Sequence, residues 1–128
     1  MKPRRVVVTG FGVVAPCGVG AEAFWKGLLG PGFTGGQSSE FHEWDPTPWF
    51  DSPKLARRAD KVEQFALAAA AEALENGGRP QVDDERIATI FGTGVGGIRT
   101  LEDQIEIRQN KGERRVSPFL VPMMMPNA

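Results

Sequence analysis

Two features of this 128-residue sequence have residue types that could do chemistry: a glycine-spaced turn and a single cysteine. The stretch RIATIFGTGVGG, residues 86–97, fits the pattern G-x-G-x-x-G through Gly92, Gly94 and Gly97. Glycines at this spacing let a backbone turn tightly against a pyrophosphate at a helix N-terminus, which would indicate dinucleotide binding. A cysteine, here Cys17, can act as a nucleophile when a base or a helix N-terminus lowers its pKa.

The dinucleotide interpretation needs more than three glycines. A binding fingerprint continues into a second strand that ends in an acidic residue about 20 positions further on. At that distance the sequence reads ERRVSPFLVP, in which Glu113 precedes the apolar stretch and two prolines interrupt it. The alternative is that the glycines allow a tight turn where another chain segment or a ligand approaches closely. The sequence favours this alternative, and we expect no NAD or NADP binding and no cofactor.

A catalytic triad around Cys17 would require His42 as the base, with Glu43 or Asp45 to orient it. These residue types suffice for a triad, but the sequence spacing does not tell where His42 lies relative to Cys17. A lone cysteine flanked by proline and glycine is more often a small packed residue. One cysteine cannot form an internal disulfide, and one histidine argues against a protein zinc site. The residues therefore favour a structural role for Cys17 and predict no metal site.

Composition narrows the class of protein. The sequence is 41% hydrophobic and 24% charged, which is typical of one soluble globular unit. Its 15 basic and 16 acidic residues are scattered and give a net charge of -1, so neither nucleic acid nor an anionic membrane is an expected partner. The apolar run after the N-terminal basic residues is too short for a secretory signal or a membrane span, which indicates a cytoplasmic protein.

The elements expected in the first half of the chain are a strand, a helix and a loop. Val6 to Val8 are β-branched and predict a central strand buried on both faces. Residues 20–30, GAEAFWKGLLG, predict a short amphipathic helix whose apolar face packs on the sheet. The composition of residues 31–53 changes to glycine, serine, proline and isolated aromatics, which predicts an irregular surface loop.

The strongest helix signal lies in DKVEQFALAAAAEALENGG, residues 60–78. Asp60 can cap this helix, Glu63 completes a capping box, and Gly77 or Gly78 can end it. Its apolar side, between residues 62 and 74, is rich in alanine. Small side chains permit close backbone approach, so we expect this helix to lie between packed layers.

A second strand and a further helix complete the pattern. Ile87 to Phe91 predict another buried strand, and Ile98, Leu101 and Ile105 predict a helix that Gly112 stops. The order strand, helix, helix, strand, helix predicts an α/β fold.

Five stretches together resemble a known family. RRVVVTGFGVVAPCG, FWKGLLG, RADKVEQFALAAAAEAL, IFGTGVGGI and RRVSPFLVPMMMPNA are similar, in this order and spacing, to the start of the β-ketoacyl-acyl-carrier-protein synthases, the elongating type II class above all. The resemblance runs from about Arg4 to Ala128. It implies a thiolase-like fold, in which two similar α/β halves form a layered αβαβα core, usually as a homodimer. Residues 1–128 would be an incomplete N-terminal part of that domain.

The resemblance also implies an acyltransferase. Family members accept an acyl chain on a cysteine and condense it with a malonyl group on acyl carrier protein, with loss of carbon dioxide, in fatty acid or type II polyketide biosynthesis. The catalytic cysteine and two histidines are expected beyond Ala128, and Cys17 matches a non-catalytic position. The chain by itself is therefore predicted to be inactive. A non-catalytic chain-length factor is the alternative, because its distinguishing position also lies beyond Ala128.

Two positions in this sequence match substrate-binding positions of the family. Val95, in GTGVGG, occupies the place of an aliphatic residue that gates the acyl pocket. Leu120, in SPFLVP, occupies an often aromatic place that helps to close the pocket across the dimer. The alternative is that both are ordinary core residues. We also expect the chain alone to leave its strands and the apolar tail after Ser117 uncovered, and so to associate.

Overall fold

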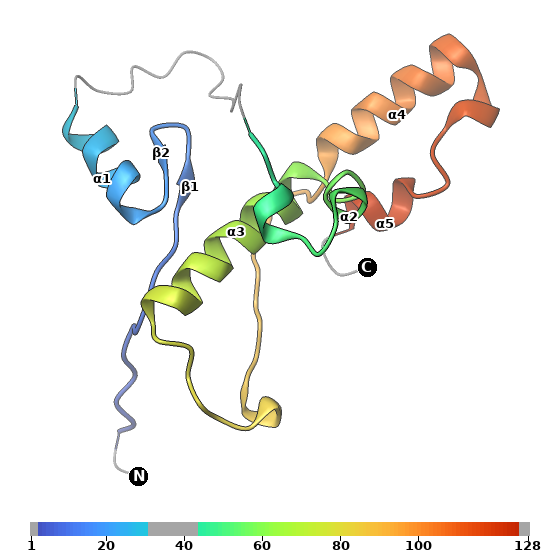
Figure 1. Ribbon diagram of the computed structural model, residues 1–128. Coiled ribbons are helices and arrows are strands. Elements are labelled where there is room, and N and C mark those ends of the chain that lie inside the picture. The colour runs from blue at the N-terminus through green and yellow to red at the C-terminus, as the bar shows by residue number, and fades with distance from the viewer. Residues whose placement is uncertain (1–2, 31–43, 126–128) are drawn as a thin grey trace. The chain divides into compact units, whose positions relative to one another are not determined.

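The computed structural model describes residues 3–30 and 44–125, which form two compact units (Figure 1). The first unit combines the described residues up to Trp44 with Ala68–Ala88, and the second combines Asp45–Leu67 with the residues from Thr89 onward. The elements in chain order are β1 Val14–Ala15, β2 Gly18–Val19, α1 Ala21–Leu29, η1 Thr47–Trp49, α2 Pro53–Ala56, α3 Lys61–Asn76, η2 Asp84–Arg86, α4 Ile98–Lys111, η3 Glu113–Arg115 and α5 Leu120–Met124.

In the first unit, a tight hairpin packs against α1. Strands β1 and β2 are antiparallel, with Val14 opposite Val19, and Cys17 lies in the turn between them. A Cβ atom added to Gly27 would lie 2.0 Å from the carbonyl oxygen of Cys17, so the helix and the turn meet backbone to backbone. The predicted helix is confirmed, but it packs through its small residues, and Trp25 remains 60% exposed.

The alanine-rich side of α3 permits close backbone approach, as its composition predicts. Cβ atoms added to Gly10 and Gly12 would lie 2.2 and 1.9 Å from the carbonyl oxygens of Ala73 and Ala69. The extended segment before β1 therefore lies directly on the helix backbone. The helix ends in a Schellman motif, in which Gly78 has a φ of 77°.

Two side chains on the last turns of α3 hold the segment that lies on it. One carboxylate oxygen of Glu72 accepts a hydrogen bond from the amide of Val13 (2.8 Å), and the other accepts from the amide of Ala21, the first residue of α1. The side-chain amide of Asn76 donates to the carbonyl of Phe11 (2.8 Å). Glu72 therefore fixes both the entry to the hairpin and the start of the helix that follows it.

The sequence predicted strands at Val6 to Val8 and at Ile87 to Phe91, and both predictions are wrong for the described residues. Neither Val6 to Val8 nor Ile87 to Phe91 carries strand pairing, and Val6, Val8 and Ile90 are 91%, 88% and 90% exposed instead of buried. A strand needs a neighbour for its backbone groups, and within residues 3–30 and 44–125 the hairpin β1–β2 is the one ladder formed. Local sequence favours an extended backbone here, but extension alone buries nothing.

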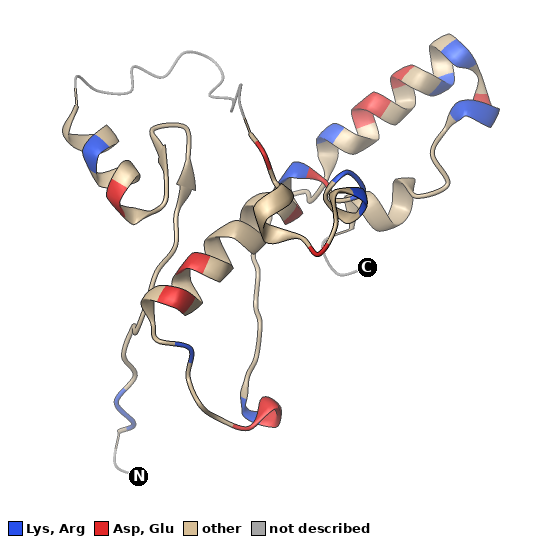
Figure 2. Ribbon diagram, viewed as in Figure 1, with Lys and Arg blue, Asp and Glu red and all other residues tan. Residues whose placement is uncertain are grey.

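The second unit contains the predicted helix α4, which ends at Gly112 with a φ of 88°. Basic and acidic side chains are interspersed along α4 (Figure 2). Helix α5 was not predicted, because two prolines lie in and beside it. Pro122 is its third residue, in the first turn, where a missing amide proton removes no helical hydrogen bond. Of the predicted loop, residues 31–43 lie outside the described residues, and residues 44–52 are irregular apart from η1.

Candidate functional site

The glycine-spaced turn is held against the last turn of α5. The amide of Gly97 donates to the carbonyl of Met124 (2.9 Å), and the amide of Gly96 donates to the hydroxyl of Thr93 (3.1 Å). A Cβ atom on Gly97 would lie 2.7 Å from Cα of Met124, whereas nothing described lies within 4 Å of one on Gly92 or Gly94. Gly97 therefore serves the close approach of another segment, as the preferred interpretation of this turn expects, whereas Gly92 and Gly94 show no such approach.

The glycine pattern also lacks the structural context of a dinucleotide site. The fingerprint requires a strand directly before the turn, and residues 87–91 are not a strand among the residues described here. Nothing in the described surroundings makes Gly92 or Gly94 a site of close approach.

One buried carboxylate joins the starts of two helices beside this turn. Asp60, 7% exposed, accepts a hydrogen bond from the amide of Val62 in α3 (3.0 Å) through Oδ1. Its Oδ2 accepts from the amide of Thr100 in α4 (3.2 Å) and from the hydroxyl of the same residue. The sequence predicted the bond within α3. It gave no sign of the bond to α4, because a partner 40 residues away leaves no local pattern.

Three contacts hold α5 and the segment that leads into it. The guanidinium of Arg58 lies 3.9 Å from the ring centre of Phe119, and the side-chain oxygen of Gln104 accepts from the amide of Ser117 (2.7 Å). The third contact is the bond from Gly97 to Met124 described above. The structure thus brings together the turn that carries Val95 and the helix that begins at Leu120. Val95 is 66% exposed and Leu120 is half-buried.

An apolar pocket of about 280 Å³ opens next to the same turn. Its walls come from α3, from the loop before α2 and from the residues that begin the turn: Phe50, Val62, Glu63, Ala66, Leu67, Phe91, Gly92 and Thr93. Neither Val95 nor Leu120 lines this pocket. The walls are hydrocarbon and aromatic apart from Thr93 and Glu63, so the pocket suits an apolar chain.

Glu63 is the one ionisable residue in the lining of that pocket. Among the described residues, its Oε1 atom is buried without a hydrogen-bond partner, so the predicted capping box is only half formed. Burial, together with the negative charge of Asp60, raises the pKa of this carboxyl above its ordinary value.

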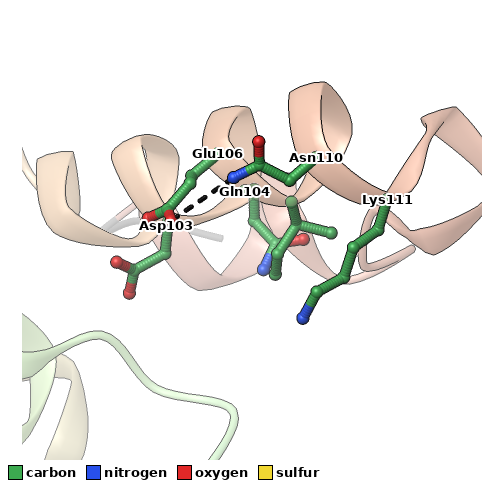
Figure 3. A pocket seen from close by; sticks show the side chains of 6 residues that line it. Asp103, Gln104, Glu106, Asn110 and Lys111 are labelled. Carbon is green, nitrogen blue, oxygen red and sulfur yellow. Dashed lines mark hydrogen bonds between the residues drawn. The ribbon is translucent and has the colours of Figure 1, made fainter.

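A polar hollow of about 350 Å³ runs along α4 (Figure 3). All of its lining residues come from this one helix: Asp103, Gln104, Glu106, Ile107, Asn110 and Lys111. The side-chain amide of Asn110 donates to the Glu106 carboxylate (3.5 Å), a bond marked in Figure 3. A single helix face with an internal hydrogen bond of this kind is a solvated surface and offers no converging groups for chemistry.

The residues of the possible cysteine triad do not form a described site. Cys17 is a free thiol in the hairpin turn, where its backbone packs on α1. His42 and Glu43 lie outside the described residues. The Asp45 carboxylate accepts instead from the hydroxyl and amide of Thr47, and these bonds lower its pKa.

Metal and membrane sites were also sought in the part of the chain that the structure describes. Residues 3–30 and 44–125 bring together no group of three or more histidine, cysteine or acidic side chains able to hold a metal ion. Within the same ranges, no helix has the length and apolar character that crossing a membrane requires.

Comparisons with protein families and with individual known proteins point to the same family. Residues 31–128 match the family described as "Beta-ketoacyl synthase, N-terminal domain". The 3-oxoacyl-[acyl-carrier-protein] synthase 2 of Synechocystis sp. is 34% identical over 99% of this chain and 34% of its own length. The protein of the same name from Vibrio cholerae is 37% identical, again over 99% of this chain and 34% of its own length. The chain thus spans about a third of the length of these relatives.

A solved structure shares the fold. It is a type II polyketide acyl carrier protein in complex with its ketosynthase bound to the hexaketide, and it matches 95% of this chain and 36% of the other with a TM-score of 0.75 at 23% identity. The likeness supports a thiolase-like fold, of which the described residues form a helix-rich part.

Proposed function

Because this chain belongs to the β-ketoacyl synthase family, whose N-terminal domain residues 31–128 match, we propose that it acts as part of a 3-oxoacyl-acyl-carrier-protein synthase. Such an enzyme joins an acyl thioester to malonyl-acyl carrier protein and releases carbon dioxide. The product serves fatty acid or type II polyketide biosynthesis. We place the enzyme in the cytoplasm as a homodimer of layered αβαβα subunits, with acyl carrier protein as its partner.

The observation that carries the proposal is the apolar pocket beside the GTGVGG turn. Its Phe50, Leu67 and Phe91 walls offer a hydrocarbon surface, and the turn borders it through Gly92 and Thr93. A growing acyl chain is the apolar part of the substrate in this reaction, and a pocket of this kind would take it out of water.

We assign the reacting groups to residues outside this chain. The reaction needs a thiolate to accept the acyl group and donors to stabilise the oxyanion and enolate that follow. Cys17 lies in a hairpin turn packed on α1, which supports a structural role for it. We propose that the cysteine and two histidines of the family lie outside residues 1–128, and that this part of the enzyme contributes walls of the acyl pocket and not the nucleophile.

Val95 and Leu120 are proposed as substrate-binding residues. The side chain of Val95 is exposed on the turn, so an acyl chain that approaches from outside the described residues can contact it. Leu120 begins α5, and this helix is bonded to the turn through Met124 and Gly97. A larger side chain at Val95 would obstruct an acyl chain that passes along the turn, and would select against long acyl groups.

The test is a fusion in which this chain replaces the matching third of the Synechocystis relative. The fusion is incubated with acyl- and malonyl-acyl carrier protein, and the 3-oxoacyl product is measured by mass spectrometry. We expect product from the fusion and none from the 128-residue chain alone. We also expect none from a control fusion in which alanine replaces the reactive cysteine in the part that comes from the relative. A soluble, folded fusion that makes no product would contradict the proposal, as would product from the chain alone.

A Val95→Phe variant of the active fusion tests the substrate-binding role. We expect kcat/KM for a long acyl group to fall by about tenfold or more relative to a short one, the scale of a clash in an apolar pocket. Leu29→Phe, at a 69% exposed position of α1, is the size-matched control. Equal effects on long and short substrates would contradict a substrate-binding role for Val95.

A further inference from the structure

Helix α4 begins without a cap of its own. Its N-cap residue is Gly97, which has no side chain to accept the free amides of the first turn. Thr100 is the third residue of the helix, and its amide is bonded instead to Oδ2 of Asp60. Asp60 therefore caps α4 from a position 40 residues earlier in the chain, while its Oδ1 caps α3 through Val62.

The geometry around Gly97 makes this double cap specific. A Cβ atom there would lie 2.9 Å from Oδ2 of Asp60 and 2.7 Å from Cα of Met124. The end of the turn thus passes between the carboxylate and the α5 backbone, with no room for a side chain. Asp60 is 7% exposed and Thr100 is 8% exposed, so little water competes for these bonds.

The charge of Asp60 suits its position. Helix N-termini carry partial positive charge, and here two of them face one carboxylate that accepts from two amides and one hydroxyl. Loss of the carboxylate would leave both helix starts with unpaired buried donors.

We propose that Asp60 is a positioning residue that sets the place of the GTGVGG turn, and so of Val95, for the acyl chain. This inference rests on the proposed ketosynthase function. Asp60 does not touch the substrate. It fixes Gly97 and the start of α4, and Val95 lies two residues before that fixed point.

The experiment compares Asp60→Ala with Glu72→Ala in the fusion described above. Glu72 is a matched control, because it also accepts two amides through one carboxylate, those of Val13 and Ala21. Both variants should lower thermal stability. Only Asp60→Ala should raise KM for a long acyl substrate, by about tenfold or more over a short one, since the loss of both bonds to Thr100 can displace the turn. The same chain-length preference in both variants would overturn the proposal.

Milder variants keep the test decisive if Asp60→Ala does not fold. Thr100→Val removes the hydroxyl bond and keeps the shape, whereas Thr100→Ser retains the hydroxyl. We expect the first to shift the chain-length preference in the same direction and the second to restore it. A Thr100→Val variant that is folded and keeps the original preference would overturn the proposal.

A second readout does not depend on activity. Amide hydrogen exchange of residues 93–101 should rise by about tenfold in Asp60→Asn and stay unchanged in Glu72→Gln, because only the first loosens the turn. If the unmutated fusion is inactive, the ketosynthase proposal fails while this measurement still decides whether Asp60 holds the turn. Equal exchange in the two variants would show that it does not.

Discussion

In most folded proteins charged side chains are exposed and apolar side chains are buried, but Asp60 and the segment Val6 to Val8 show the opposite. The carboxylate is 7% exposed and fully bonded, whereas the valines, among the most frequently buried residue types, are 67–91% exposed. The difference is one of partners. Asp60 finds its donors in two helix starts within the described residues, but the valines need neighbouring strands that those residues do not supply. A helix satisfies its own backbone, and a strand does not.

The largest effect should come from the exposed side of this comparison. We expect the 128-residue chain alone to associate or remain molten, because Val6, Val8 and Ile90 and many other large apolar residues face water. Size-exclusion chromatography should show oligomers, and a dye for apolar surface should bind. The fusion should bind several-fold less dye, since it covers these segments. A monodisperse monomer with a cooperative thermal transition would show that the valines tolerate exposure.

Backbone contact on α3 gives the next largest effect. Gly12→Ala would place a Cβ 1.9 Å from the carbonyl oxygen of Ala69, so either the segment or the helix must move. We expect the free energy of unfolding of the fusion to fall by about 3 kcal/mol, at the upper end for overpacking. Gly30→Ala is the matched control, because its nearest neighbours lie at 3.4 and 3.5 Å. Similar urea midpoints for the two variants would contradict this packing.

The sequence predicted the longer helices, α1, α3 and α4, well and their distant partners poorly. The cap at Asp60, the end of α3 near Gly78 and the stop of α4 at Gly112 are local signals, since each depends on residues within a few positions. The prediction of a strand at Val6 to Val8 is wrong because strand formation, unlike these helix signals, does not depend on local residues alone. Its β-branched residues favour extension, but pairing depends on chain elsewhere, and no local pattern reports whether a partner is present.

The candidate site shows the same division. Composition and spacing identified the GTGVGG turn, and the resemblance to the family singled out Val95 and Leu120. The bonds that place the turn, from Asp60 to Thr100 and from Gly97 to Met124, join residues 40 and 27 positions apart. Helix α5 was missed because its prolines argue against a helix, although one of them lies in the first turn, where it is tolerated.

A third prediction concerns Glu72, the other carboxylate that accepts hydrogen bonds from two backbone amides. Glu72→Ala should lower the free energy of unfolding of the fusion by about 2 kcal/mol, because the amides of Val13 and Ala21 lose a charged acceptor. Glu72→Gln should lower it by about half as much, since the side-chain oxygen can still accept one bond. Urea unfolding measures both variants. A Glu72→Gln variant as unstable as Glu72→Ala would mean that the charge, and not the bond, stabilises the hairpin.

The smallest effect should come from Glu63, where a charge faces an apolar pocket without a partner for its buried oxygen. Burial and the nearby Asp60 raise the pKa of Glu63, so the folded protein holds this proton more tightly than the unfolded chain. Stability from this group is therefore present below the unfolded pKa and is lost as the pH rises through the folded pKa.

Glu63→Gln removes that loss. We expect it to raise the free energy of unfolding of the fusion by about 0.5 kcal/mol near pH 7, a small value because the residue is partly exposed and its charge is screened. The gain should be smaller at pH 4 than at pH 7, because the raised pKa of Glu63 means that more of the glutamate is protonated at the lower pH. An equal gain at both pH values would show that packing of the amide, rather than relief of a buried charge, explains the change. Glu63 would then resemble the hydrogen-bonded polar residues around Asp60 and not the exposed valines, which lack partners.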